Sequence, residues 1–374
     1  MLTRAGQLDH PYSLRPVAGA SFSLLDGRPV VFSESAQKIY ELNQVGAHIW
    51  CRLSDHKQAE AICEDLTKLG LDRFVARDHV HQALEDWFKL GLLQVDWGLS
   101  KANSFSVRVG RLAVTIRTSS ERLTQLLIPL FGQTGGITDK IADTFEVVEI
   151  DRQVHIFHNR TRVAQCAINE LVPTLKAQIT ELIMLKASPD VTFHAACLLS
   201  GGQGLLVSGR PGAGKTTLAV HLMVAGFEYA ADDIVLIAHD GRATGVPFAP
   251  ALKSGAWAMI EKLCPDLGKS AVHSRPDGRR VRYLNVPRGV RNSSVPVGWI
   301  LFIKRATNVP VKLAPLGQLE TISRLIDGSY SPDGKLTNQG FLAIKRTLAD
   351  AKSFELQYSD AALARDAIVD LCHG

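Results

Sequence analysis

The feature that most restricts the fold of this chain is a short apolar run that breaks into glycines and resumes as an expected helix. It covers residues 205–217, and from Gly209 onward it reads G-x-x-x-x-G-K-T, a pattern typical of a phosphate-binding P-loop. Glycine is required because it lets the backbone turn with a positive φ and close its N–H groups around phosphate oxygens. An ordinary Gly-rich turn is the alternative, but here an apolar strand, the complete motif and a helix occur together. The stretch therefore predicts a nucleotide-binding α/β core.

The P-loop pattern assigns a role to each of its polar residues. Lys215 would bring a positive charge to the β- and γ-phosphates, and the hydroxyl of Thr216 would bind Mg²⁺. The helix expected over residues 216–225 would point its positive N-terminal end at the anion, and Gly226 would end it as a left-handed cap. The residues expected to bind the nucleotide are Gly209, Gly212, Ala213, Gly214, Lys215, Thr216 and Thr217.

Length, charge and cysteine usage exclude several classes of protein. A chain of 374 residues exceeds what one core usually organises, so we expect more than one domain. We find no apolar run of the roughly 18 residues that span a bilayer and no signal peptide, so we expect a cytoplasmic protein with no membrane partner. The net charge of +5 is spread along the chain, which argues against nucleic acid as a partner. Six scattered cysteines indicate neither a zinc cluster nor a disulfide framework.

The first hundred residues have a pattern of their own. Residues 20–32 alternate around Asp26-Gly27, which predicts a β-hairpin. Three helices are expected to follow, at residues 35–54, 58–69 and 77–90, and the second and third show apolar residues at three- and four-residue spacing. A short strand is expected at residues 92–95. This order of a hairpin, three helices and a strand favours a small winged-helix domain of α+β type.

This N-terminal region resembles the PqqD-type peptide-chaperone family over about residues 21–97. The resemblance rests on Tyr-Glu-Leu-Asn at 40–43, Ala-His-Ile-Trp at 47–50 and Trp-Phe-Lys-Leu-Gly-Leu-Leu at 87–93. Family members bind the leader region of a ribosomally made precursor peptide as an added strand, so the resemblance implies such a leader as partner. A winged helix used for dimerisation or for DNA binding is the alternative. Acidic residues in the third expected helix argue against DNA.

The segment from residue 104 to 190 is interpreted as a support or lid for the nucleotide-binding part. Its alternating and periodic stretches predict strands at 105–109 and 112–116, a helix up to 131, a hairpin at 145–158 and a helix at about 167–187. His155 and His158 fall on opposite faces of an extended strand. We therefore expect them to be solvated and not to share a metal ion.

Further polar residues flank the P-loop in the sequence. His194 lies in an expected strand at 191–199, and Asp232-Asp233 follow the P-loop helix, where they open an apolar strand that ends at 237. Two neighbouring aspartates repel each other unless a cation or a proton lies between them. One of them suits Mg²⁺ and the other suits a base with an altered pKa. Taken singly, the histidine could be a packed residue and the aspartates a turn.

The order of His194, P-loop and aspartate pair resembles the nucleotide domain of HPr kinase/phosphorylase and of its relative phosphoenolpyruvate carboxykinase. The resemblance implies three catalytic residues, Asp232, His194 and Lys215. Asp232 would deprotonate an acceptor hydroxyl, and Asp233 together with Thr216 would hold Mg²⁺. His194 would lie near the transferred phosphoryl group. Which aspartate is the base and which the metal ligand stays open.

Basic residues farther along the chain could complete such a site. The resemblance places Lys253 and Arg282 where related proteins carry phosphate-binding residues, and a solvated surface is the alternative. Arg282 also belongs to a basic patch with Arg275, Arg279 and Arg280 that could meet phosphates or an acidic peptide. The Arg-Gly signature loop of HPr kinases has only a faint counterpart in Arg288-Gly289, which argues against HPr itself as substrate.

Together these patterns predict an α/β P-loop kinase core of the HPr kinase type with an N-terminal winged-helix, PqqD-like domain. The expected division is residues 1–100, 101–190 and 191–374. The joint resemblance implies an ATP- and Mg²⁺-dependent kinase that phosphorylates a Ser or Thr hydroxyl of a ribosomally made precursor peptide in natural-product biosynthesis. Alternatives are an ATP-gated peptide chaperone without kinase activity and a kinase of a small-molecule hydroxyl. The acceptor, the donor (ATP, GTP or pyrophosphate) and a homo-oligomeric state stay open.

Overall fold

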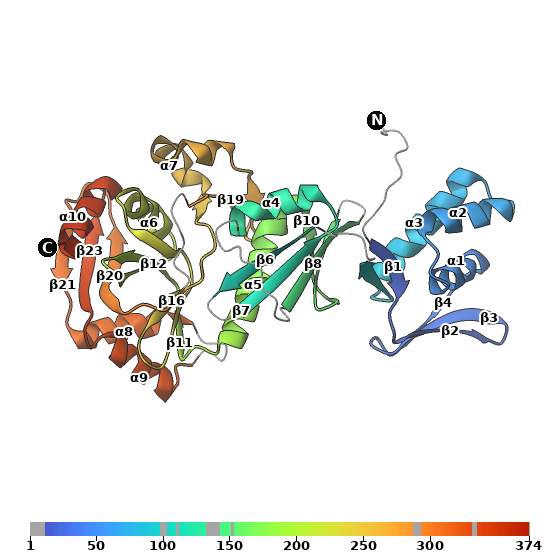
Figure 1. Ribbon diagram of the computed structural model, residues 1–374, viewed down its shortest axis with the longest axis horizontal. Coiled ribbons are helices and arrows are strands. Elements are labelled where there is room, and N and C mark those ends of the chain that lie inside the picture. Colours follow the sequence, from blue (N-terminus) through green and yellow to red (C-terminus); the bar gives the residue numbers. More distant parts are fainter. Residues whose placement is uncertain are drawn as a thin grey trace. The chain divides into compact units, whose positions relative to one another are not determined.

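The computed structural model describes residues 12–97, 103–109, 112–131, 143–150, 153–286, 293–330 and 335–373. It is a mixed α/β structure, as expected, and the chain divides into two compact units (Figure 1). The first unit contains the residues up to 104 together with 117–121 and 145–165; the second contains 105–116, 122–144 and the residues from 166 onward. The expected division into three domains stays a prediction. None of the described helices is long and apolar enough to cross a membrane.

The first unit begins with the predicted hairpin. Strands β2 (Ala20–Leu25) and β3 (Arg28–Ser33) pair antiparallel around Asp26-Gly27, whose φ angles of 50° and 77° form the tight turn. Strand β4 (Lys38–Glu41) pairs with the other edge of β3. The predicted helix over residues 35–54 is therefore wrong in its first half, because main-chain pairing with β3 holds residues 38–41 extended.

Three helices pack behind this sheet around two tryptophans. They are α1 (Gln44–Ser54), α2 (Ala59–Lys68) and α3 (Arg73–Lys89). Asp72 starts α3 earlier than expected, since its carboxylate accepts from the backbone N–H groups of Phe74 and Val75. Trp50 and Trp87 are both buried and meet edge to face, with their ring centroids 5.2 Å apart. Strand β5 (Leu93–Trp97) then pairs with β1 (Tyr12–Pro16).

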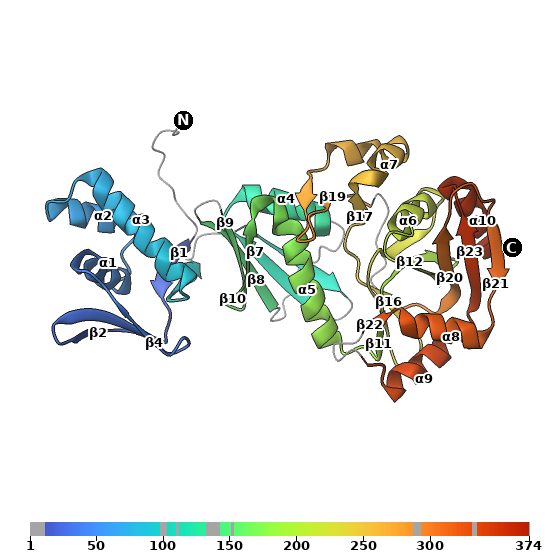
Figure 2. The same ribbon diagram turned by 180° about the vertical axis from the view of Figure 1, so that it is seen from behind.

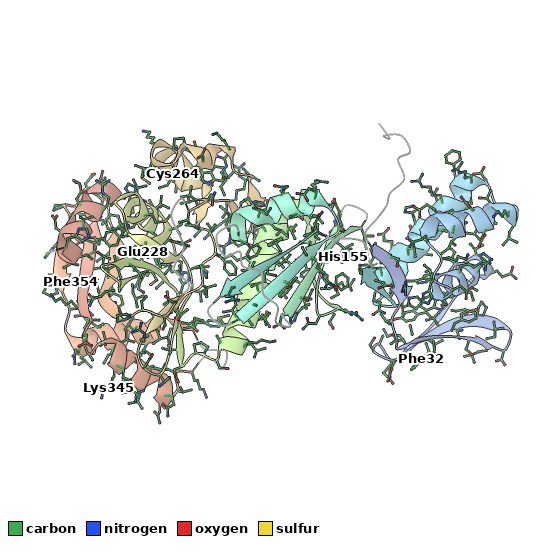
Figure 3. The ribbon with its side chains drawn as sticks, in the orientation of Figure 1. Phe32, His155, Glu228, Cys264, Lys345 and Phe354 are labelled. Atoms are coloured by element: carbon green, nitrogen blue, oxygen red, sulfur yellow. The ribbon has the colours of Figure 1, made fainter. Side chains whose placement is uncertain are left out.

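The first unit also holds a hairpin that buries a histidine. Strands β8 (Asp143–Ile150) and β9 (Gln153–His158) pair as predicted, and β10 (Thr161–Ala167), which the sequence did not indicate, lies beside β9. His155, which Figure 3 labels, is 3 % exposed. Its ring meets Phe88 edge to face with centroids 4.7 Å apart. The expectation that His155 is solvated is therefore wrong. The apolar surface of α3 covers this face of the hairpin.

The centre of the second unit is a six-stranded sheet in the order β14-β12-β13-β20-β23-β21. The strands are β12 (Ala195–Ser200), β13 (Gln203–Ser208), β14 (Glu228–Ala231), β20 (Val297–Arg305), β21 (Lys312–Pro315) and β23 (Lys352–Tyr358). The three central strands β13, β20 and β23 run parallel, and the outer pairings are antiparallel. Buried parallel strands are apolar on both faces, which accounts for the continuous apolar runs of β13 and β20.

Helices cover both faces of this sheet (Figures 1 and 2). On one face, α6 (Lys215–Val224) and α10 (Ala361–His373) share a core with alternate residues of β13 such as Leu205 and Val207. On the other face, α8 (Gln318–Asp327) and α9 (Asn338–Thr347) share a core with the residues between, such as Leu206. The helix predicted over residues 216–225 is confirmed as α6. Gly226, with a φ of 106°, follows α6 as predicted.

Two smaller sheets and further helices complete the second unit. One sheet has the order β16-β15-β11-β22, and the other has the order β17-β19-β18. Their strands are β11 (Val191–Phe193), β15 (Val235–Ile237), β16 (Ala243–Gly245), β22 (Ser329–Tyr330), β17 (Ala251–Lys253), β18 (His273–Ser274) and β19 (Arg280–Tyr283). The unit also contains β6 (Asn103–Val109), β7 (Leu112–Thr118), α4 (Glu121–Phe131), α5 (Leu171–Ala187) and α7 (Trp257–Leu263). Helix α5 begins a few residues later than the predicted start at 167, after β10 and a short 3₁₀ turn.

Two chain crossings between sheets differ from the sequence prediction and position the candidate site. The expected strand at 191–199 is two strands, β11 and β12, which belong to different sheets and are separated by His194 alone. The stretch after α6 is likewise two strands, β14 and β15, with Asp232 and Asp233 between them. Because β14 pairs with β12 and β15 pairs with β11, both crossings occur side by side.

Candidate active site

The loop from Gly209 to Gly214, here called the glycine loop, joins β13 to α6 in a conformation that requires glycine. Gly212 and Gly214 have φ angles of 86° and 97°. A Cβ at Gly209 would lie 2.8 Å from Cγ1 of Ile303, and a Cβ at Gly214 would lie 2.8 Å from the hydroxyl oxygen of Tyr358. Neighbouring strands therefore pack directly against the loop backbone at Gly209 and Gly214, which leaves no space for a side chain at these two positions.

Two polar contacts hold the glycine loop in shape. The ammonium group of Lys215 donates to the carbonyl oxygen of Gly209 at 2.7 Å, so it reaches across the loop. The hydroxyl of Tyr358, on β23, donates to the carbonyl oxygen of Ala213 at 3.1 Å. Burial lowers the pKa of Lys215, although the charges of Asp233 and Asp232 oppose that shift. The charge of Lys215 thus lies close to both aspartates.

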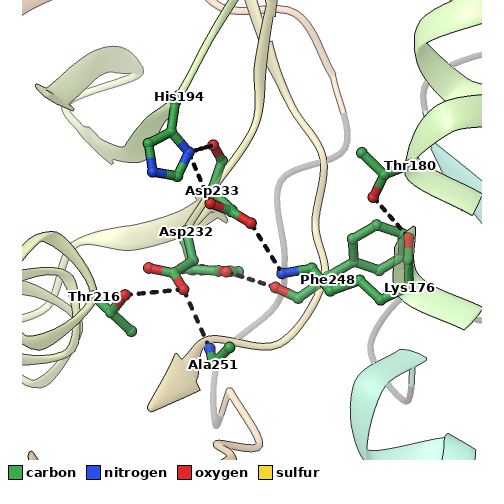
Figure 4. A network of polar contacts seen from close by, with 9 residues as sticks. Lys176, Thr180, His194, Thr216, Asp232, Asp233, Phe248 and Ala251 are labelled. Carbon is green, nitrogen blue, oxygen red and sulfur yellow. Dashed lines mark hydrogen bonds and ion pairs between the residues drawn. The ribbon is translucent and has the colours of Figure 1, made fainter. Parts of the chain in front are cut away.

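His194 and Asp233 meet where the chain crosses between the two sheets (Figure 4). Nδ1 of His194 lies 2.9 Å from Oδ1 of Asp233 and 3.2 Å from its backbone carbonyl oxygen. The side chains of the two residues are 47 % and 39 % exposed, so both can reach a bound molecule. The structure therefore brings together the histidine and one aspartate that the sequence singled out on either side of the P-loop pattern.

Lys176 is a third member of this cluster, which no pattern in the sequence indicated. It comes from the middle of α5, and its ammonium nitrogen lies 3.3 Å from Oδ2 of Asp233 (Figure 4). The Lys176 side chain is 12 % exposed and its ammonium group lies over the ring of Phe248. A single lysine in an otherwise apolar part of a helix was the available signal. It did not indicate that the lysine would reach the aspartate pair.

The charge of Lys176 and the histidine determine the state of Asp233. Burial on its own would raise the pKa of this carboxyl, but the positive charge of Lys176 and the hydrogen bond with His194 hold it well below its usual range. Burial also opposes the charge on Lys176, and Asp233 outweighs that effect and raises the pKa of the lysine. Asp233 is therefore a fixed, ionised carboxylate at neutral pH.

Asp232 has a different environment from its neighbour. Its Oδ2 accepts from the hydroxyl of Thr216 at 3.2 Å and from the backbone N–H of Ala251 at 3.2 Å. Its Oδ1 is buried with no hydrogen-bond partner among the described residues. Burial and the charge of Asp233 raise the pKa of Asp232. A buried carboxylate with a free oxygen beside a hydroxyl fits a hard cation such as Mg²⁺, which would supply the missing positive charge.

The two predicted phosphate-binding cations lie in neighbouring strands but have different surroundings. Lys253, at the end of β17, is close enough to Lys215 for its charge to contribute to the lowered pKa of Lys215. Arg282, on β19, instead donates to Glu261 at 2.7 Å and lies over the ring of Trp257. Its guanidinium is thus already engaged by a carboxylate and an aromatic ring. Arg288-Gly289 lie outside the described residues.

An N-terminal segment and a second segment of the chain match different known proteins. Residues 28–93 match the family model of PqqD, coenzyme PQQ synthesis protein D. The chain is also 27 % identical over 104 residues to HPr kinase/phosphorylase from Exiguobacterium sp., a match that covers 28 % of this chain and 33 % of that relative. Two segments of the chain are therefore similar to known proteins, one to PqqD and one to HPr kinase/phosphorylase. The match spans about a third of the length of the curated relative.

Two solved structures are also similar to parts of this chain. One is TbiB1 in complex with the TbiA(beta) leader peptide, which is 19 % identical, with 24 % of this chain and 99 % of that chain covered and a TM-score of 0.20. The other is the Hpr(Ser) kinase/phosphatase from Coxiella burnetii, which is 13 % identical, with 48 % and 97 % covered and a TM-score of 0.23.

Proposed function

We propose that this protein is an ATP- and Mg²⁺-dependent kinase that phosphorylates a Ser or Thr hydroxyl of a ribosomally made precursor peptide. One observation carries the proposal: Asp232, bonded to Thr216, and Asp233, bonded to His194, lie together beside the glycine loop. A phosphoryl transfer needs such positioned charges more than covalent chemistry. The similarity to HPr kinase/phosphorylase supports the class of reaction, and the P-loop role of the glycine loop is part of the proposal.

The hydrogen bonds favour one division of roles between the aspartates. Asp232 is bonded to Thr216, the residue that the P-loop pattern assigns to Mg²⁺, so Asp232 and Thr216 would hold the cation together. Asp233 is the more exposed of the two and is paired with His194, so it would orient the acceptor hydroxyl. As a weakly basic carboxylate it would accept the hydroxyl proton late in the transfer, when the forming O–P bond has made that proton acidic. This division exchanges the roles that the family resemblance implies. Mg²⁺ would neutralise the charge on the transferred phosphoryl group.

Two asparagine variants test this division. Asp232→Asn removes the charge beside Thr216, so saturation should require at least about tenfold more Mg²⁺, a change worth about 1.4 kcal/mol. Asp233→Asn should lower kcat about a hundredfold and leave the Mg²⁺ dependence unchanged, since it changes only the acceptor side. If Asp233→Asn raised the Mg²⁺ requirement and Asp232→Asn did not, the family-implied assignment would be the right one.

The peptide partner is proposed from the N-terminal domain. In the described part of this domain, β2 and β4 are the outer strands of the sheet β2-β3-β4, so each has one edge without a partner strand. Leu24 on β2 and Ile39 on β4 are 64 % and 59 % exposed, which provides apolar surface beside each edge. A leader peptide added as a further strand would gain main-chain hydrogen bonds there.

The winged-helix arrangement of the N-terminal domain and a cytoplasmic location of the protein also stay predictions.

Capture of the leader would explain why one chain combines a leader-binding domain with a kinase domain. A tethered core peptide reaches an effective concentration of about a millimolar, so a weak acceptor site would be sufficient. The proposal is tested by incubating the full chain with ATP, Mg²⁺ and candidate precursor peptides that consist of a leader and a core containing Ser and Thr. Peptide delivery without phosphoryl transfer would favour the ATP-gated chaperone. Phosphoryl transfer to a small hydroxyl compound, and not to the peptide, would favour a kinase of a small-molecule hydroxyl.

A further inference from the structure

We infer that Arg305 is an additional phosphate-binding residue of the nucleotide site, an inference that rests on the proposed binding of ATP. Arg305 is the last residue of β20, which runs parallel to β13 directly beside it. The carboxyl ends of parallel neighbours lie at the same edge of a sheet, so β20 ends beside the start of the glycine loop. Cδ of Arg305 lies 4.0 Å from the position that a Cβ of Gly214 would take.

Arg305 is on the face of the sheet that carries α6. Ile303, two residues earlier, packs into the core shared with α6 and α10, whereas Phe302 packs into the core shared with α8 and α9. Because side chains alternate along a strand, Arg305 lies on the same face as Ile303 and Lys304 lies on the opposite face. The guanidinium is therefore on the side where the glycine loop leads into the N-terminus of α6.

The guanidinium of Arg305 has no hydrogen-bond or ion-pair partner among the described residues, and the residue is exposed. Three other arginines of this unit are paired with carboxylates, namely Arg282 with Glu261, Arg324 with Glu320 and Glu355, and Arg365 with Asp366. A guanidinium offers five N–H donors in a planar fork that matches the oxygens of a phosphate. An unpaired fork beside a loop of backbone N–H groups suits a polyphosphate.

Tyr358 fixes the position of the loop relative to Arg305. The two residues are directly paired in the register of β20 and β23, and the hydroxyl of Tyr358 donates to Ala213 in the loop. The arginine and the glycine loop are therefore anchored to the same pair of strands. Arg305 would contact the phosphates without a large movement of the backbone.

The test is calorimetric titration of the full chain with ATP in the presence of Mg²⁺, and with adenosine, in matched variants. Arg305→Ala should weaken ATP binding about tenfold or more, because charge-assisted hydrogen bonds to the phosphates are lost, and should leave adenosine binding unchanged. Arg305→Lys should be intermediate, since a lysine keeps the charge but not the fork. Lys304→Ala is the matched control and should bind ATP within about twofold of the wild type.

Each outcome of this titration has a separate meaning. If the wild type binds ATP and Arg305→Ala binds it as tightly as Lys304→Ala does, the inference is wrong while the proposed function stands. An equal loss for ATP and adenosine would also overturn it, since the arginine would then contact the nucleoside. If the wild type binds no nucleotide, the proposed function fails and the inference fails with it. Equal melting temperatures of the wild type and the three variants check that the variants are folded.

Discussion

Nδ1 of His194 lies 2.9 Å from Oδ1 of Asp233, although the two residues are 39 positions apart in the sequence. The contact exists because the chain passes between the two sheets twice, from β11 to β12 and from β14 to β15. The two crossings lie side by side, since β11 pairs with β15 and β12 pairs with β14. His194 is the one residue between β11 and β12, so its position is fixed by strands on either side. A polar pair held by backbone pairing is preorganised for chemistry.

Replacement of His194 should therefore reduce catalysis more than nucleotide binding. We expect His194→Ala to lower kcat for phosphoryl transfer about a hundredfold, because Asp233 loses the partner that orients it, and to leave ATP affinity within about twofold. Steady-state kinetics together with a nucleotide titration measure the two effects. His239→Ala, on an exposed loop, is the control. A loss of ATP affinity equal to the loss of kcat would show that His194 acts in binding instead.

Lys176 should contribute to both stability and activity. Lys176→Met leaves the ionised Asp233 without its buried partner, and we expect the free energy of unfolding to fall by about 1–2 kcal/mol, a value reduced from that of fully buried pairs because Asp233 is partly exposed. Lys176→Arg should recover part of the loss. Urea denaturation measures these changes, and Lys262→Met on the surface of α7 is the control. Equal stability of Lys176→Met and the control would contradict the account.

The glycine loop should not tolerate a methyl group at Gly214. Gly214→Ala requires a non-glycine residue at a φ of 97° and places its Cβ 2.8 Å from the hydroxyl of Tyr358. We expect a loss of about 1–2 kcal/mol in stability and at least about tenfold weaker ATP binding. Gly255→Ala has no atom within 4 Å of its new Cβ and should be neutral. ATP affinity of Gly214→Ala within twofold of that control would show that the loop does not bind the nucleotide as proposed.

The buried His155 should make stability depend on pH. Burial lowers the pKa of His155 from 6.5 to about 4, and the charges of Arg162 and Lys89 act in the same direction. Between these values the unfolded chain takes up a proton that the folded chain does not, so stability falls as the pH decreases from about 6.5 to 4. The loss approaches about 3 kcal/mol at the lower end. His155→Phe should abolish this part of the pH dependence of the melting temperature; an unchanged dependence would show that His155 is not responsible.

Local patterns in the sequence predicted those parts of the structure that depend on local chemistry. The glycine loop, α6 and the hairpin of β2 and β3 each have their determining residues within a few positions of one another. Strand β4 was missed because residues 38–41 are held extended by pairing with β3, a contact between strands that no local pattern in this segment indicates. His155 was expected in solvent because no local pattern indicates that Phe88 covers it.

Local sequence patterns also predicted only part of the candidate site. His194, Asp232 and Asp233 could be singled out from their order around the P-loop pattern. The pairing of Thr216 with Asp232, rather than with Asp233, depends on where β14 ends and could not be foreseen. Lys176 lies 57 positions from Asp233 and reaches it only because α5 packs beside the chain crossing. Arg305 likewise reaches the loop through strand order alone.

The most direct test of the central claim is the mass of the precursor peptide after incubation with the full chain, ATP and Mg²⁺. The peptide should gain one phosphoryl group on a Ser or Thr outside its leader. With Asp233→Asn the gain should be about a hundredfold slower, although this variant still binds ATP. A peptide whose mass stays unchanged, while both the leader and ATP are bound by the wild type, would contradict the claim that this protein is a peptide kinase.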